Sequence, residues 1–385
     1  MKYTLHLDHH VAAAAAQGAS HEDKQTHPLS KIGLDMHCQF HVAVRQQDHA
    51  TPGAARRFAP AEFVPWVRTL LAAGQAVHVV YESCGFGFGL YRALLAAGAK
   101  CYVVSPQALD EGRTGVKTDG RDALALCQAL DRYLQGNAKA LRVIRVPSEA
   151  QEQRRHISRQ REQLVRHRSK LQAQGRALLV NHTLPAPAHW WMAQTWGRLQ
   201  KHLPDWMALR LEVTRPMLLG FEEQIGKLSA QLEVLAVGPA PRGLGKLTSV
   251  ILGNEVCDWK RFKNRRQISS YTGLCPSEYS SGDKRKQGSV SKRGNPRLRA
   301  ALVEGAWRLV RFQPQYPPIK KRLQVLAKGA RATGAARKKA IVAVARRLAV
   351  DLWRLHTGQC TAQHLGLLLG GAEPRPSVLG ELEND

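Results

Sequence analysis

The sequence predicts three parts: an α/β domain, a pair of long helices, and a basic, mainly α-helical C-terminal domain. The first prediction rests on short apolar segments that alternate with helix-like segments over residues 31–145. The second rests on apolar residues that recur every seven positions within residues 146–237. The third rests on clusters of lysine and arginine over residues 238–360. Residues 1–30 are expected to form a flexible leader and residues 361–385 a disordered tail.

The α/β prediction comes from the order of strand-like and helix-like segments. Residues 31–47 alternate between apolar and small or polar side chains, as on a half-buried strand. The continuous apolar run Val77–Tyr81 predicts a strand buried on both faces of a sheet, and Cys101–Val104 predicts another. Helices are expected over residues 61–73, 85–98 and 119–134. Strands that alternate with helices are typical of an α/β domain.

Two helices with a seven-residue repeat are predicted between the two domains. The first carries one apolar row, at Ile157, Leu164, Leu171 and Leu178. The second carries two rows, at Leu211, Leu218, Ile225 and Leu232 and at Phe221, Leu228 and Leu235. Two apolar rows indicate a coiled-coil seam. The repeat leaves open an antiparallel hairpin, pairing with another subunit, or an ordinary helical bundle within one chain. Pro216 is expected to start or kink the second helix.

The charge balance indicates a polyanionic partner. The chain has 57 lysines and arginines against 30 acidic residues, a net charge of +27. Such a surplus favours nucleic acid, because each phosphate contact releases counterions. The seven cysteines include no C-x-x-C pair, which supports neither a zinc ribbon nor a disulfide framework and favours a cytoplasmic protein. No apolar run approaches the roughly 20 residues of a membrane helix, so no membrane partner is expected.

Four carboxylates are placed where they could hold metal ions. Asp35 ends the apolar half of the first strand pattern, and Glu82 directly follows the buried run before it. Asp119 and Asp122 open a predicted helix three residues apart, on one face. If these segments converge, their oxygen ligands suit Mg²⁺ or Mn²⁺, which can assist displacement at phosphorus. The alternatives are a helix cap at Asp119, a dipole contact at Asp122, and surface charges at the other two.

Ordered motifs in both domains resemble those of one family, the DEDD transposases of insertion sequences. The acidic motifs are Gly33-Leu34-Asp35, Tyr81-Glu82-Ser83-Cys84-Gly85 and Lys117-Thr118-Asp119-Gly120-Arg121-Asp122-Ala123. The second half is similar in Gly243-Leu244-Gly245, Phe262, Tyr271-Thr272-Gly273-Leu274-Cys275-Pro276, Ser280-Ser281-Gly282, Ser291-Lys292-Arg293-Gly294-Asn295 and Leu298-Arg299. The resemblance covers roughly residues 31–350. It departs from the common pattern in the leader and in the glycine-rich stretch around Phe86 and Phe88.

The resemblance implies a RuvC-like, RNase H-type first domain, a helical linker and a C-terminal transposase domain with a catalytic serine. It implies a catalytic, metal-binding tetrad of Asp35, Glu82, Asp119 and Asp122, with Mg²⁺ or Mn²⁺ as cofactor. It implies Ser281 as the nucleophile, with the adjacent Ser280 left open. The implied function is a DNA transposase or recombinase that forms a phosphoserine link, guided by a structured non-coding RNA. Its DNA partners would be the element ends and the target, joined by a dimer or tetramer of this chain.

Basic residues near these motifs are the predicted nucleic-acid contacts. Those beside the serine could bind the scissile phosphate, and those on the first long helix could contact RNA: Lys284, Arg285, Lys286, Lys292 and Arg293, and Arg154, Arg155, Arg159 and Arg161. Two other functions stay open. One is a metal-dependent hydrolytic nuclease or junction resolvase that needs no serine. The other is a non-catalytic RNA- or DNA-binding protein. By composition alone, Ser280-Ser281-Gly282 would be a polar turn.

Overall fold

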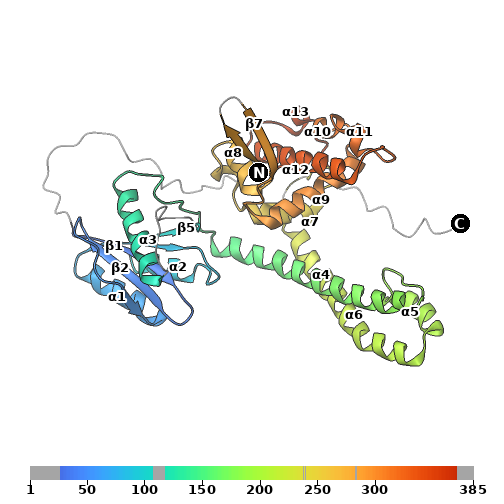
Figure 1. The fold of residues 1–385 in the computed structure, drawn as a ribbon, viewed down its shortest axis with the longest axis horizontal. Helices are drawn as coiled ribbons and strands as arrows, with labels where there is room; N and C mark the ends of the chain where they lie inside the picture. The colour runs from blue at the N-terminus through green and yellow to red at the C-terminus, as the bar shows by residue number, and fades with distance from the viewer. Residues whose placement is uncertain (1–26, 107–117, 237, 239, 282–283, 371–385) are drawn as a thin grey trace, which may run out of the picture. The chain divides into compact units, whose positions relative to one another are not determined.

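The chain forms two compact units, residues 1–146 and residues 147–385 (Figure 1). The computed structural model describes residues 27–106, 118–236, 238, 240–281 and 284–370, with only the main chain at 280, 281 and 284–286. The predicted leader therefore lies almost entirely outside the described residues. The division of the second unit into a linker and a C-terminal domain remains a prediction.

The first unit is built on a five-stranded mixed sheet in the order β3-β2-β1-β4-β5. The strands are β1 (Leu29–Met36), β2 (His41–Gln47), β3 (Arg56–Phe58), β4 (Ala76–Glu82) and β5 (Lys100–Val104). β1 pairs antiparallel with β2 and parallel with β4. The single strand pattern predicted over residues 31–47 is thus a hairpin, because the His37 amide donates to the Phe40 carbonyl (2.9 Å) in a turn. The other two predicted strands are confirmed.

Helices cover both faces of this sheet, so the α/β prediction is confirmed. α1 (Pro60–Ala72) and α2 (Gly89–Ala96) pack on one face, over a core that contains Ile32 and Leu34. α3 (Asp119–Leu134) packs on the other face, with the bounds that the sequence predicts. α2 begins at Gly89 instead of Gly85, because the glycine-rich residues between them form a turn.

The second unit begins with two long helices, α4 (Glu149–Asn181) and α6 (Asp205–Val234), which pack against each other. A reciprocal capping box between Ser148 and Gln151 starts α4. The short helices α5 (Ala193–Leu199) and η1 (Gln200–His202) join the pair. In α6 the predicted row is buried at every seventh residue: Leu211, Leu218, Ile225 and Leu232.

The two long helices run antiparallel within one chain. Arg161 near the start of α4 bonds Ser229 near the end of α6, and Arg168 further along α4 pairs with Glu222. Of the arrangements that the repeat leaves open, the antiparallel hairpin is therefore the one formed inside this chain. Pro216 lies within α6 and does not start it.

Four helices of the second unit surround its main apolar core: α7 (Lys246–Val256), α8 (Arg265–Thr272), α9 (Pro296–Phe312) and α12 (Gly334–His356). A hairpin of β6 (Pro276–Ser281) and β7 (Lys284–Val290) lies between α8 and α9 in the chain. The short elements η2 (Trp259–Arg261), α10 (Pro317–Lys320) and α11 (Leu323–Leu326) complete this part. No helix among the described residues is both long and apolar enough to cross a membrane.

The disordered tail predicted from residue 361 starts too early. α13 (Ala362–Leu365) follows α12, and Leu365 and Leu367 are buried in the core. The Arg242 amide then donates to the Leu368 carbonyl (2.8 Å), which ties this segment to the residues just before α7. Burial of these two leucines stabilises the segment against the core. Residues 371–385 lie outside the described part.

Candidate functional site

The parallel pairing of β1 with β4 brings two of the predicted acids to one edge of the sheet. Leu34 lies opposite Tyr81 in the register of these strands. Asp35 and Glu82 are the next residues along their strands, at the carboxyl ends. Both acids are partly buried. The sheet therefore places them as neighbours on adjacent strands.

Strand alternation also puts both acids on the face that α3 covers. Side chains two residues apart on a strand share a face. Glu82 shares its face with Val80, which packs with Leu126 of α3. Asp35 shares its face with Gly33, which lies directly beneath α3.

α3 runs antiparallel to β1, so its first turn lies over the acidic edge. The ammonium group of Lys31, near the start of β1, pairs with Asp131 near the end of α3. The Cys127 thiol donates to the Lys31 carbonyl at 3.4 Å. Asp119 and Asp122 occupy the first turn of α3, at the opposite end of the helix from Asp131. All four predicted acids thus belong to one face and one edge of the first unit.

These acids do not form a single tight cluster in the described part of the chain. No group of three or more histidine, cysteine, aspartate or glutamate side chains there is gathered closely enough to hold a metal ion. Thr118 occupies the N-cap position of α3, so Asp119 is not the helix cap. The donor set fits the implied ion in kind, because Mg²⁺ and Mn²⁺ prefer carboxylate oxygens. The assignment of these four acids as metal ligands remains a prediction.

Gly33 is the residue that lets α3 approach the acidic edge. A Cβ atom at this position would overlap the main-chain oxygen of Ala123 and the main-chain nitrogen of Cys127. Only glycine fits where a helix backbone lies this close to a strand.

We expect Gly33→Ala to lower the free energy of unfolding of the first unit by about 3 kcal/mol, because helix backbone must move to admit the methyl group. Urea unfolding of the full-length protein measures this change. Gly89→Ala is the control, since a Cβ there meets nothing within 4 Å. Equal midpoints for Gly33→Ala and the wild type would contradict the close approach of α3.

The predicted nucleophile lies at the end of the β6–β7 hairpin. Ser281 is the last residue of β6 and lies opposite Lys284, and Ser280 lies opposite Arg285. The main chain therefore carries both serines next to the hairpin's turn. The side chains of residues 280–286 lie outside the described part, including the predicted contacts Lys284, Arg285 and Lys286.

Two of the motifs join at the base of this hairpin. The Ser291 amide donates to the Cys275 carbonyl (2.8 Å), and the Asn295 amide donates to the Tyr271 carbonyl (2.8 Å). Gly294 has a φ of 151°, and a Cβ there would lie 2.5 Å from the Tyr271 carbonyl oxygen. The fit explains why glycine stands at this place in the motif.

Two predicted phosphate contacts lie on the second of these motifs. Lys292 and Arg293 are exposed. The Arg299 guanidinium donates to the Lys292 carbonyl (3.2 Å) and to the Thr272 carbonyl (3.1 Å). These two hydrogen bonds fix the main chain of the loop. The structure thus presents two cations on a fixed loop beside the hairpin's base.

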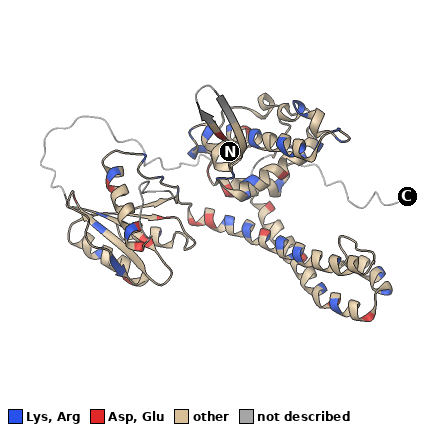
Figure 2. Cartoon of the chain, viewed as in Figure 1, with Lys and Arg blue, Asp and Glu red and all other residues tan. Residues whose placement is uncertain are grey.

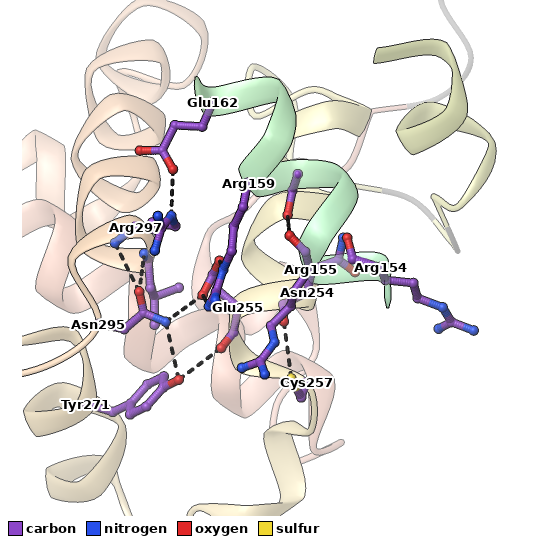
Figure 3. Close-up of polar contacts among 12 residues, drawn as sticks. Arg154, Arg155, Arg159, Glu162, Asn254, Glu255, Cys257, Tyr271, Asn295 and Arg297 are labelled. Atoms are coloured by element: carbon purple, nitrogen blue, oxygen red, sulfur yellow. Dashed lines mark hydrogen bonds and ion pairs between the residues drawn. The ribbon is translucent and has the colours of Figure 1, made fainter. Parts of the chain in front are cut away.

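Lysine and arginine recur along α4 (Figure 2), but the arginines of this helix differ in their surroundings (Figure 3). Arg154 is exposed, and its side chain points away from the other labelled residues in Figure 3. It lines a cavity of about 350 Å³ together with Lys246. Arg159 instead pairs with Glu255, and Arg161 donates to Ser229 (2.7 Å). The guanidinium groups of Arg159 and Arg161 are therefore used within the second unit, which the prediction of nucleic-acid contacts did not anticipate.

Glu255 is a buried acid that belongs to none of the predicted motifs. Its side chain is 1% exposed. Burial by itself raises the pKa of this carboxyl, but hydrogen bonds from Arg159 and Asn295 outweigh burial and hold the pKa below its usual value. Arg155 contributes to the same lowering of the pKa through its charge. The sequence signal was available: an acid within the apolar helix that ends at Val256.

A cleft lined by basic side chains, here called the basic cleft, lies outside the motifs. Its volume is about 490 Å³, and four of its lining residues are Lys321, Arg322, Arg347 and Arg354. The buried Asp351 lies among them, where it accepts from Arg347 (3.0 Å). The cleft adds a cationic surface suited to phosphate groups.

Comparison with known proteins defines the class of this chain. Residues 32–183 match a transposase model for the DEDD group of IS110, and residues 241–320 match the model described as "Transposase IS116/IS110/IS902 family". These regions contain the acidic edge and the serine hairpin. The class that both models name is the transposase, an enzyme that cuts and rejoins DNA. The chain is a member of the IS116/IS110/IS902 family of insertion-sequence transposases.

Individual relatives agree with this assignment. A protein of Sinorhizobium fredii named as a transposase is 32% identical, over 72% of this chain and 76% of its own length. The transposase for insertion sequence element IS1111A of Coxiella burnetii is 29% identical, over 80% of this chain and 84% of its own length. The transposase for element IS1328 of Yersinia enterocolitica is 27% identical, over 72% and 83% of the two chains.

Proposed function

We propose that this transposase cuts and rejoins DNA through Ser281, assisted by divalent metal held at the acidic edge of the first unit. The observation that carries the proposal is the placement of four acids on one face and edge of a mixed α/β sheet, in a chain whose second unit carries the serine next to the turn of a hairpin and two exposed cations beside the base of that hairpin. A RuvC-like, RNase H-type character of the first unit is part of the proposal. The α/β sheet is compatible with it.

The chemical step is a transfer of the DNA phosphoryl group to serine. The Ser281 oxygen attacks the scissile phosphorus and loses its proton, and the bond from phosphorus to one bridging oxygen breaks. The released DNA end leaves as a hydroxyl, so the phosphoserine link keeps the bond energy for rejoining. Lys292 and Arg293, at the base of the hairpin, would orient the DNA backbone next to the scissile bond through their charge. Asp35, Glu82, Asp119 and Asp122 would hold Mg²⁺ or Mn²⁺, which supplies charge stabilisation at phosphorus.

The partners in this proposal are DNA, a structured guide RNA and further copies of the chain. The net charge of +27 supports a polyanionic partner. Arg154, Arg155 and the basic cleft of α10, α12 and α13 offer contacts to backbone phosphates. A synapse that joins element ends to a target needs at least two subunits, and two-ended joining suits four. We propose that the enzyme acts at the nucleoid in the cytoplasm.

Metal removal tests the proposal directly. The purified protein, with the RNA that copurifies with it, is incubated with labelled element-end and target DNA in Mg²⁺ or in EDTA, and the products are separated on a denaturing protein gel. We expect a labelled protein–DNA adduct in Mg²⁺, its loss in EDTA and its return when Mg²⁺ is added back. Prior digestion with ribonuclease is expected to remove the adduct too.

Each alternative function predicts different products on the gel. Nicked DNA with no attached protein would identify a hydrolytic nuclease. Binding without cleavage, the same in Mg²⁺ and EDTA, would identify a non-catalytic binding protein. An adduct of equal intensity in EDTA would overturn the role of the metal, and one that survives ribonuclease would overturn the role of RNA.

A further inference from the structure

We propose that Arg159, Glu255 and Asn295 form a positioning bridge that fixes the loop of Lys292 and Arg293 relative to α4. The effect on DNA joining rests on the function proposed above. The contacts themselves lie within the second unit and do not depend on it. The bridge assigns to Arg159 a role as a positioning residue, in place of a contact to nucleic acid.

The centre of the bridge is the Glu255 carboxylate on α7 (Figure 3). One of its oxygens accepts from Arg159 Nε and the other from Arg159 Nη2, both at 3.2 Å. It also accepts from Asn295 Nδ2 at 2.7 Å. Hydrogen bonds to a charged group are about twice as strong as neutral ones and restrict geometry when they are bidentate. The carboxylate therefore ties α4 to the loop before α9.

Asn295 passes this restraint to both neighbouring elements. Its Oδ1 accepts from the amides of Arg297 (3.0 Å) and Leu298 (3.1 Å), which caps α9. Its Nδ2 also donates to the Tyr271 hydroxyl (3.3 Å), and that hydroxyl donates to the Glu255 carbonyl (3.0 Å). One amide side chain thus contacts α7, α8 and α9, so its orientation is fixed on three sides.

A second contact joins the same two segments. Glu162 lies three residues after Arg159, on the same face of α4. Its carboxylate accepts from Arg297 Nε at 2.6 Å. Both contacts end within the loop and first turn that follow Lys292 and Arg293. Two fixed points on one helix face prevent the loop from turning about either one.

Burial separates the role of Arg159 from that of Arg154. The Arg159 side chain is 35% exposed, and two of its donor nitrogens are directed at a carboxylate that is 1% exposed. Drawing Arg159 toward a DNA phosphate would leave a buried, unpaired charge, which is strongly unfavourable. Arg154 is exposed and makes no side-chain contact among those drawn in Figure 3. The two arginines are expected to respond differently to the same substitution.

The experiment compares five full-length variants: Arg159→Gln, Glu255→Gln, the double variant Arg159→Met/Glu255→Met, Arg154→Gln and Glu223→Gln. Each is assayed for the rate of adduct formation at saturating element-end DNA, for Kd and its salt dependence, and for melting temperature. Glu223→Gln removes an exposed ion pair to Lys227 and is the control for loss of a salt bridge.

For Arg159→Gln and Glu255→Gln we expect the saturated rate to fall by about 30-fold, since displacement by about 1 Å can cost about 100-fold. Kd is expected to change by less than about twofold, with an unchanged salt slope. Arg154→Gln is expected to weaken Kd and reduce the salt slope by about one, the loss of one phosphate contact. Glu223→Gln is expected to resemble the wild type.

The apolar double variant separates positioning from mere stability. Replacing a whole buried ion pair by apolar side chains often restores stability, whereas removing one partner does not. We expect its melting temperature to recover toward the wild type while its rate stays low, because methionine makes no directed bond to Asn295. Recovery of the rate together with the melting temperature would overturn the proposal.

Amide hydrogen exchange measures how firmly the loop of Lys292 and Arg293 is held, and it does not depend on the DNA reaction. We expect faster exchange at residues 291–295 in all three bridge variants and unchanged exchange in Glu223→Gln. If the wild type forms no adduct, the proposed serine chemistry fails, while this exchange still tests the bridge. Unchanged exchange in the bridge variants, or a salt slope reduced by one in Arg159→Gln, overturns the bridge even where the adduct forms.

Discussion

Ser281→Ala is expected to abolish the covalent protein–DNA adduct and to lower DNA joining by at least about 1,000-fold. Neighbouring residues cannot replace a nucleophile whose oxygen must be in line with the scissile bond. In other enzymes, loss of a catalytic serine lowers the rate by about this factor or more. The measurement is the denaturing gel with labelled DNA, run with wild type and variant at equal concentration. DNA affinity should stay within about twofold, because alanine removes a single hydroxyl.

Ser280→Ala is the matched variant for this test. Both serines are at the end of β6, one opposite Lys284 and the other opposite Arg285. If Ser280→Ala loses the adduct and Ser281→Ala keeps it, the nucleophile is Ser280. If both keep it, the hairpin is not the catalytic element.

Glu82→Gln is expected to lower adduct formation by at least about 100-fold at saturating Mg²⁺. The amide keeps the size of the side chain but removes the charge that attracts a divalent ion and the second oxygen that can ligate it. Asp35→Asn should act in the same direction, since Asp35 is the neighbouring acid on β1. Titration of the adduct with Mg²⁺ and with Mn²⁺ measures the effect.

Glu62→Gln is the control for these two changes. Glu62 lies in the first turn of α1, on the other side of the sheet, where its carboxylate accepts from the Ala59 amide (3.1 Å). A glutamine oxygen can accept the same hydrogen bond, so activity should not change. Wild-type rates in both Glu82→Gln and Asp35→Asn would mean that the acidic edge is structural.

The sequence predicts most of the first unit because its signals are local. The apolar run of β4 and the bounds of α3 follow from neighbouring residues alone. The turn between β1 and β2 was missed, because residues 37–40 contain no glycine or proline to mark it. The placement of the four acids on one face needed the strand register, which a single sequence does not contain.

The site in the second unit was harder to predict because its contacts are distant in the chain. Arg159 and Glu255 are 96 positions apart. In the sequence, Arg159 is one of several arginines on a polar helix, which is also the pattern of a nucleic-acid contact. Only the fold distinguishes it from Arg154, because the distinction depends on which helix face meets α7. Leu365 and Leu367 were misjudged for the same reason, since their partners lie in distant helices.

The buried row of α6 constrains how the enzyme's helical pair can change in length. Leu211, Leu218, Ile225 and Leu232 keep one face because seven residues make almost two turns. One inserted residue would rotate every later side chain by about 100° and expose this row. Seven residues inserted in each helix would preserve the packing and lengthen the pair by about 10 Å. Natural variants are therefore expected to differ in the reach of this pair by steps of about that size.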